Sequence, residues 1–210
     1  MKNRFYFACF RDNVGENVSF HCHNGKGYST DISKAHVCSL EEAQYAFDIA
    51  REFEMPVSAD HVDELSVWKV DCQYLREVSH HSESGRYVAY KNRKWDGNDV
   101  YWVDGIGSSL DFSKAKIFDK IEEREGFTFI TFEDADKVKR RTFSMNLLDK
   151  RKMVQGAGLK MPERLRKELR RKANPMERLN CPECGRINWQ QHTYFFEGCS
   201  NYECGEWRLK

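Results

Sequence analysis

Two stretches of the chain, one at its start and one near its middle, alternate apolar and polar residues in the same way. Phe5 and Phe7, and again Tyr87 and Ala89, are two residues apart and therefore fall on one face of a strand. A turn rich in Asn, Gly and Asp follows each stretch, and a second short apolar run comes after it. The turns span residues 12–17 and 95–98, and the second runs span residues 18–23 and 100–103. The pattern predicts two β-hairpins.

The segments that include and follow the second strands align with each other at an offset of 80 residues. Residues 20–35 and 100–115 share seven identities, which are two glycines followed by a Ser, an Asp, a second Ser, a Lys and an Ala. We therefore interpret residues 1–80 and 81–150 as two copies of one β-hairpin–loop–helix module. Two such copies would pack into an α+β domain with a small antiparallel sheet.

Helix signals follow each copy of the loop. Ser39 and Thr131 have Glu42 and Asp134 three residues later, which is the spacing of an N-cap and its capping-box partner. Apolar residues at helical spacing continue from both caps. The predicted helices span residues 40–53, before Pro56, and 132–151. Residues 66–78 favour a strand that closes the first copy.

A basic helix is predicted after a glycine-containing break at residues 155–158. Pro162 suits the first turn of a helix over residues 163–173, in which Leu165 and Leu169 share one side. The cations on this helix are Arg164, Arg166, Lys167, Arg170, Arg171 and Lys172. A cluster of this kind binds a phosphate backbone without regard to sequence. The alternatives are a solvated helix and a helix docked on the acidic front of the chain.

The formal charge of the chain is +1, but it is unevenly distributed. Residues 1–136 hold 16 basic and 25 acidic residues, a charge of −9. Residues 137–178 hold 15 basic and 4 acidic residues, a charge of +11, and the remainder carries −1. An acidic front joined to a basic connector at 151–178 indicates that the chain meets a charged partner.

Four cysteines near the end of the chain form two knuckles, C-x2-C and C-x4-C. They are Cys181, Cys184, Cys199 and Cys204. Four thiolates close a tetrahedral zinc site and leave no open position, so we expect one structural Zn²⁺ rather than a catalytic ion. Gly185 and Gly205 are expected to take positive φ after each knuckle, and His192 is expected to be a surface residue rather than a ligand. The pattern predicts a zinc ribbon over residues 179–210.

The second knuckle, Gly198-Cys199-Ser200-Asn201-Tyr202, resembles the C-terminal four-cysteine zinc fingers of bacterial type IA topoisomerases over residues 181–207. Unlike those fingers, it has no proline before Cys204. The resemblance implies contact with single-stranded DNA through aromatic stacking. The aromatic residues concerned are Trp189, Tyr194, Phe196, Tyr202 and Trp207. Over residues 4–135, the repeated modules resemble those of small bacteriophage-encoded accessory proteins.

Other candidate chemistry in the chain is weaker. The two G-x-G loops lack the third glycine and the immediate helix of a dinucleotide site, so turns explain them better. A second metal at His21, Cys22 and His23, with His80 and His81, is less favoured than solvent-facing histidines. We find no hydrolase or nuclease motif and predict a non-enzymatic protein.

The sequence also bears on where the protein works. The first residues read as a strand without a signal-peptide pattern, and no apolar run is long enough for a membrane helix. The scattered Cys9, Cys22, Cys38 and Cys72 are expected to be buried thiols in a reducing, cytoplasmic setting.

Three functions remain open on these grounds. The first is a nucleic-acid-associated accessory protein that uses the basic helix and the ribbon on DNA or RNA, with single strands favoured. The second is a protein-binding modulator of a host factor, such as a polymerase or a defence enzyme, in which the zinc is purely structural. The third is a nuclease or hydrolase whose site is assembled from distant residues.

Overall fold

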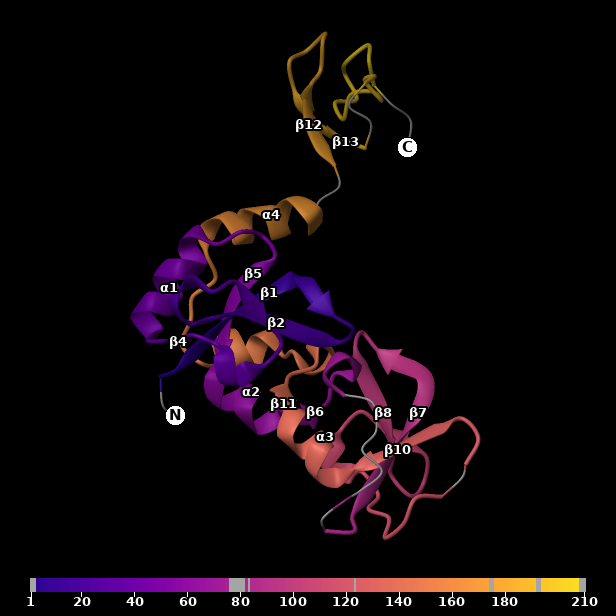
Figure 1. Ribbon diagram of the computed structural model, residues 1–210. Helices are drawn as coiled ribbons and strands as arrows, with labels where there is room; N and C mark the ends of the chain where they lie inside the picture. The colour runs from indigo at the N-terminus through magenta and orange to yellow at the C-terminus, as the bar shows by residue number, and fades with distance from the viewer. Residues whose placement is uncertain are drawn as a thin grey trace. The chain divides into compact units, whose positions relative to one another are not determined.

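The structure of the protein is a computed structural model that describes residues 3–75, 82, 84–122, 124–173, 176–191 and 194–207 (Figure 1). For residues 169 and 171–173 it describes the backbone alone. The chain forms two compact units, Met1–Lys160 and Met161–Lys210. The predicted α+β class is confirmed, because helices alternate with several antiparallel sheets. The module boundaries predicted at residues 80, 150 and 178 stay predictions.

The first sheet is built around the strand that the alternation at Phe5 and Phe7 predicts. Its strands are β1 (Phe5–Val14), β2 (Asn17–His21), β3 (Tyr28–Ser29), β4 (Val37–Cys38) and β5 (Glu54–Ser58). The order is β3-β2-β1-β4, and β5 pairs with β1 as well. The first predicted hairpin is therefore confirmed as β1–β2, with Gly15 at its turn in a positive-φ conformation.

The second sheet pairs its strands as the first sheet does. Its strands are β7 (Tyr87–Asp96), β8 (Asp99–Val103), β9 (Ser108–Ser109) and β10 (Phe127–Thr131), in the order β10-β7-β8-β9. β7 and β10 form five residue pairs, as β1 and β5 do. The β1–β2 and β7–β8 hairpins both shift register midway, between Cys9 and Val14 and between Tyr90 and Trp95. The second predicted hairpin is confirmed as well.

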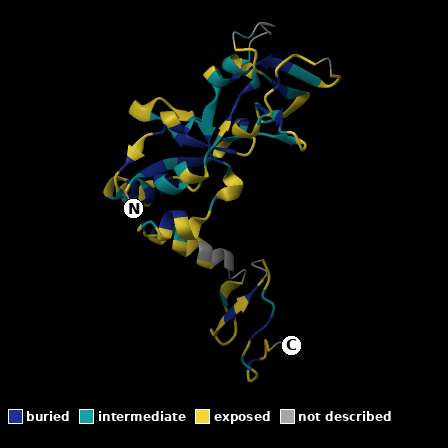
Figure 2. Ribbon diagram, turned by 90° about the horizontal axis from the view of Figure 1, so that it is seen from below, coloured by how far each residue is buried: buried dark blue, intermediate teal, exposed yellow. Residues whose placement is uncertain are grey.

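Short elements join the two sheets within the first unit. β6 (Val67–Lys69) pairs antiparallel with β11 (Arg140–Thr142). Val18 N donates to Phe143 O at 2.9 Å, and Val100 N donates to Val70 O at 3.1 Å, so β2 is bonded to the segment after β11 and β8 to the segment after β6. Figure 2 shows that buried residues gather on the inner strands of the first unit, whereas its loops are largely exposed.

Two helices of the first unit begin where the caps predict, α1 (Leu40–Ile49) and α3 (Phe132–Val138). A third, α2 (Ala59–Leu65), was not predicted, and the Ser58 side chain before it makes no capping hydrogen bond. Ser39 and Glu42 form a capping box at α1, and the Thr131 side chain accepts a hydrogen bond from Asp134 N at α3. Short 3₁₀ turns lie at His23–Gly25, Ile32–Lys34, Cys72–Tyr74, Phe112–Lys114 and Met145–Leu147, and a π-helical turn at Arg151–Gln155.

Three element predictions are wrong. The helix predicted from Phe132 through Arg151 ends at Val138, because the chain turns into β11 and pairs with β6. The helix at 40–53 ends at Ile49, and Pro56 lies within β5. Proline is tolerated there because β5 pairs with β1 only and is an edge strand. The strand predicted over 66–78 is limited to β6 in the described residues, followed by a 3₁₀ turn.

The second unit contains a helix and a hairpin. α4 (Glu163–Ala173) begins where Pro162 predicts, and β12 (Glu177–Asn180) pairs antiparallel with β13 (Ile187–Gln190). Residues 194–196, between the two knuckles of the predicted ribbon, are irregular. The core of this unit consists of three buried cysteines, against which Phe196 packs.

Candidate metal centre

The four knuckle cysteines converge, as their spacing predicts. The Sγ atoms of Cys181, Cys184, Cys199 and Cys204 all lie within 4.8 Å of one another. Cys181 Sγ is 3.6 Å from Cys204 Sγ, and Cys184 Sγ is 3.5 Å from Cys199 Sγ. Zn–S bonds of about 2.3 Å would place tetrahedral sulfurs roughly 3.8 Å apart. The cluster could therefore hold one metal ion, and its donors suit zinc.

The first knuckle is the turn between β12 and β13. Cys181 N donates to Arg186 O at 2.8 Å, and Gly185 N donates to Cys181 O at 2.9 Å, which closes the loop around the sulfurs. Gly185 takes φ 71°, as predicted. This turn depends on residues adjacent in sequence, which is why the motif could predict it.

The second knuckle differs from the prediction at its glycines. Gly205 does not have a positive φ, whereas Gly198, just before Cys199, takes φ 116°. A side chain at Gly205 would meet the Glu183 carboxylate, because an added Cβ would be 2.9 Å from its oxygens. A side chain at Gly205 would therefore displace the flexible Glu183 carboxylate, which lies 3.0 Å from Cys204 Sγ.

The side-chain amides of two buried β13 residues hold the second knuckle in place. Sequence reasoning missed both residues. Asn188 Nδ2 is 3.8 Å from Cys199 Sγ, and its Oδ1 accepts from Ser200 N at 2.7 Å. Gln190 Nε2 donates to Phe195 O at 2.7 Å, and its Oε1 accepts from Glu197 N at 3.1 Å. The signal for both is their alternation along β13, in which Asn188 and Gln190 are buried while Ile187 and Trp189 are exposed.

The thiols of the cluster differ in acidity. Burial raises the pKa of Cys181, but hydrogen bonds from the backbone N–H groups of Cys184 and Glu183 outweigh it and bring that pKa to about 7. The carboxylate of Glu183, 3.0 Å from Cys204 Sγ, raises the pKa of the Cys204 thiol. A metal ion would bind the thiolate form of each cysteine.

Four of the five predicted stacking residues are exposed. The exposed fractions are 49% for Trp189, 98% for Tyr194, 75% for Tyr202 and 47% for Trp207, and Phe195 is also exposed at 58%. Phe196 packs against the cysteines instead. The second unit therefore exposes all of the predicted rings except Phe196.

The predicted cations on α4 are only partly described. Arg166, Lys167 and Arg170 are exposed, and Arg164 is half-buried. Lys167 Nζ pairs with Glu163 Oε1 at 2.9 Å. The side chains of Arg171 and Lys172 lie outside the described residues.

Three of the basic residues before α4 form ion pairs within the first unit. Lys139 pairs with Asp136 at 2.5 Å, Arg140 with Asp99 at 2.7 Å, and Arg141 with Asp63 at 3.0 Å. The cations at 139–141 are therefore neutralised by carboxylates of the first unit, whereas those of α4 belong to the second unit. The basic charge read from the sequence is thus divided between the two units.

Within the described part of the chain, the histidines do not form a second metal site. The four cysteines are the one group of potential metal ligands that converges there. His23 is exposed, as predicted. His21 is half-buried, and its Nε2 lies 3.3 Å from Glu54 Oε1, so the prediction that it faces solvent is wrong. His80, His81 and His192 lie outside the described residues.

The remaining cysteines are all free thiols. Cys9 and Cys38 are buried as predicted, whereas Cys22 and Cys72 are half-buried. Burial raises the pKa of Cys38 and of Cys72.

Among the described residues, no helix is both long enough and apolar enough to span a bilayer.

Comparison with known proteins gives no match: no protein family, no curated protein and no solved structure is significantly similar to the chain. The fold and the cysteine cluster therefore carry the functional argument.

Proposed function

We propose that the protein is a non-enzymatic, nucleic-acid-associated accessory protein whose second unit binds single-stranded DNA or RNA. The four cysteines hold one structural Zn²⁺, which stabilises the loops that display the aromatic side chains. The observation that carries the proposal is the exposure of Trp189, Tyr194 and Tyr202 around this cluster. Exposed rings of this kind stack on unpaired bases with little preference for sequence.

The cations of α4 support the same function. The helix holds 6 basic and 2 acidic residues, so it carries +4. Arg166 and Arg170 are exposed, and Arg side chains contact phosphates in a salt-dependent manner. The ribbon itself is nearly neutral, so the rings would supply the stacking and α4 the electrostatic attraction.

We also propose that residues 1–160 contain two copies of one module, which form the body that the second unit is attached to. Hydrogen bonds between the two halves are reciprocal, which supports this. Met145 N donates to Glu16 O and Cys72 N donates to Asn98 O, both at 2.8 Å. Contacts related in this way are typical of two copies arranged about a twofold axis. Such a body would serve as a core or protein-interaction domain.

Fluorescence anisotropy with a labelled single-stranded oligonucleotide tests the nucleic-acid proposal. Replacing Trp189, Tyr194 and Tyr202 by Ala should weaken binding, since each stacked base contributes about 1–3 kcal/mol. Arg166→Glu with Arg170→Glu should weaken binding and reduce its salt dependence, because fewer phosphate contacts release fewer counterions. The matched control is Lys26→Glu with Lys120→Glu, two exposed cations of the first unit.

Equal effects of the two charge reversals would show that general electrostatic attraction, not α4, is responsible. If the wild-type chain binds no oligonucleotide but retains a host protein after nuclease treatment, the nucleic-acid proposal is wrong. The chain would then be a protein-binding modulator with a purely structural zinc.

A further inference from the structure

A cavity in the first unit lies outside the metal centre. It has a volume of about 430 Å³ and is lined by residues of β1, β2, β4, β5 and α1. Its apolar surface comes from Phe7, Cys38, Ala46, Ile49 and Ala50. This size and lining are those of small-molecule sites, in which a few polar groups orient the ligand.

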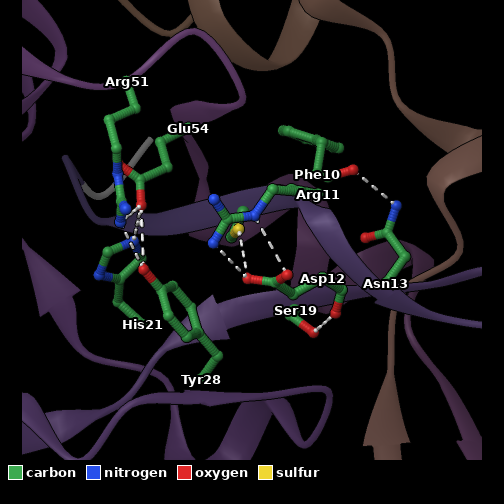
Figure 3. Close-up of polar contacts among 10 residues, drawn as sticks. Phe10, Arg11, Asp12, Asn13, Ser19, His21, Tyr28, Arg51 and Glu54 are labelled. Atoms are coloured by element: carbon green, nitrogen blue, oxygen red, sulfur yellow. Dashed lines mark hydrogen bonds and ion pairs between the residues drawn. The ribbon is translucent and has the colours of Figure 1, made fainter.

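The polar wall of the cavity is centred on Glu54, whose side chain is 6% exposed (Figure 3). Arg51 donates to both carboxylate oxygens, from Nη2 to Oε1 at 2.6 Å and from Nε to Oε2 at 3.1 Å. The Tyr28 hydroxyl lies 3.1 Å from Oε1, and His21 Nε2 lies 3.3 Å from the same oxygen. The neighbours of Glu54 thus satisfy the carboxylate and offset the cost of burying it.

Two nitrogen atoms of this cluster take no part in these contacts, namely Arg51 Nη1 and His21 Nδ1. Burial lowers the pKa of His21, against the opposing effect of Glu54. His21 Nε2 lies beside the Glu54 carboxylate without a hydrogen bond to it, and the carboxylate favours the neutral tautomer that carries its proton on Nε2. In that tautomer Nδ1 is an acceptor, whereas Arg51 Nη1 is a donor. Since the charges of Arg51 and Glu54 cancel, a neutral ligand fits this wall better than an ion.

In the second proposed copy, apolar side chains fill the region that corresponds to the cavity. Strand register places Val103 where His21 lies and Phe127 where Glu54 lies. Phe118 and Phe129 fill this region edge to face, with ring centroids 5.1 Å apart. The fold therefore does not need a polar wall here, and the described residues between Phe118 and Phe127 contain no counterpart of α1. A polar wall beside an open cavity, where the second proposed copy packs phenyl rings, favours a binding function for this region.

We propose that this cavity binds a planar heteroaromatic ring whose edge carries a hydrogen-bond donor beside an acceptor, as a nucleobase does. The ring lies between Phe7 and the α1 residue Ala46, and its edge bonds to Arg51 and His21. It belongs either to a free nucleoside or to one base of a strand. The proposal rests on the cavity and on the comparison with the second proposed copy, and it does not depend on the metal centre or on α4.

Calorimetric titration of the full chain with adenosine, guanosine, cytidine and uridine tests the proposal. One of them should bind, and His21→Val should weaken its binding about tenfold, as the loss of one hydrogen bond predicts. Ala46→Phe fills the cavity and should abolish binding. Tyr45→Ala, on the same helix but 70% exposed and outside the cavity, is the matched control and should change nothing.

A second arm distinguishes the source of the ring. If no nucleoside binds, but oligonucleotide binding weakens with His21→Val and not with Tyr45→Ala, the ring belongs to a strand. If neither ligand responds to the cavity variants, the proposal is overturned, whatever the ribbon and α4 variants do. Should Ala46→Phe fail to fold, His21→Val decides alone, because valine already occupies the corresponding position at Val103.

Discussion

At the scale of single residues, Asp99 shows how the first unit buries charge between its halves. Its side chain is fully buried, with Arg140 Nη2 at 2.7 Å from Oδ1 and Asn17 Nδ2 at 2.6 Å from Oδ2. Lys69, itself 3% exposed, has Nζ 3.8 Å from Asp99 Oδ2. Burial raises the pKa of Asp99 in spite of Arg140, Asn17 and Lys69. Arg140 and Lys69 both contact this carboxylate, so a substitution of Asp99 removes an ion-pair partner from both cations.

Asp99→Asn should therefore destabilise the first unit strongly. The change leaves Arg140 and Lys69 without the carboxylate, and breaking a buried ion pair from one side costs about 3–5 kcal/mol. The free energy of unfolding in urea measures this. Asp119→Asn, at an exposed position, is the control and should cost little. A loss no larger than that of the control would mean that the buried cations find other partners.

At the scale of elements, the two long hairpins meet at their turns. Gly15 and Gly97 both take positive φ, at 60° and 59°. A Cβ at Gly97 would lie 2.6 Å from Gly15 N, and a Cβ at Gly15 would lie 2.4 Å from the Asp96 carboxylate. The two turns can approach this closely only because neither glycine has a side chain. This role of the glycines is separate from the positive φ that each turn requires.

Gly97→Ala should destabilise the chain by more than the strain of a positive-φ alanine alone, which is about 1 kcal/mol. The reason is that its Cβ would also collide with the backbone at Gly15. Gly107→Ala is a matched control, because Gly107 lacks positive φ and has open space where a Cβ would be. Chemical denaturation of both variants measures the difference, and equal stabilities would contradict close packing of the turns.

At the scale of the whole molecule, the charge follows the two compact units rather than the sequence segments. Residues 1–160 hold 24 basic and 26 acidic residues, a charge of −2, and residues 161–210 hold 10 and 7, a charge of +3. The two units also differ in what stabilises them. The first buries large apolar side chains such as Phe5, Phe20 and Trp102, whereas the second has three cysteines at its centre. We therefore expect the second unit to depend on a metal ion.

Cys184→Ser, or removal of the metal by a chelator, should unfold the second unit and leave the first intact, because binding of the ion supplies the folding free energy of the ribbon. Limited proteolysis followed by mass spectrometry should show cuts beyond residue 176 and a resistant fragment that ends near residue 160. Cys22→Ser, outside the cluster, should give the wild-type pattern. Loss of the resistant fragment in Cys184→Ser would mean that the two units fold together.

Arrangements within one turn of the chain were more predictable from the sequence than contacts with distant partners, for a physical reason. Cys181 and Cys184 share one turn, and Ser39 caps a helix with a residue three positions away, so spacing alone predicts both arrangements. β5 and β10 escaped prediction because Glu54–Ser58 and Phe127–Thr131 lack a clear alternation and are strands through pairing with distant partners. The buried amides Asn188 and Gln190 escaped because polar residues are usually expected at the surface.

By itself, the sequence determined the two hairpins, the helix caps and the set of four converging cysteines. Each of these depends on φ preferences and hydrogen bonds between residues close along the chain. Only the tertiary structure decided that Arg140 pairs with Asp99 and that His21 lies against Glu54 beside a cavity. Those contacts join residues more than 30 positions apart, and burial, which sequence spacing does not specify, sets which of them form.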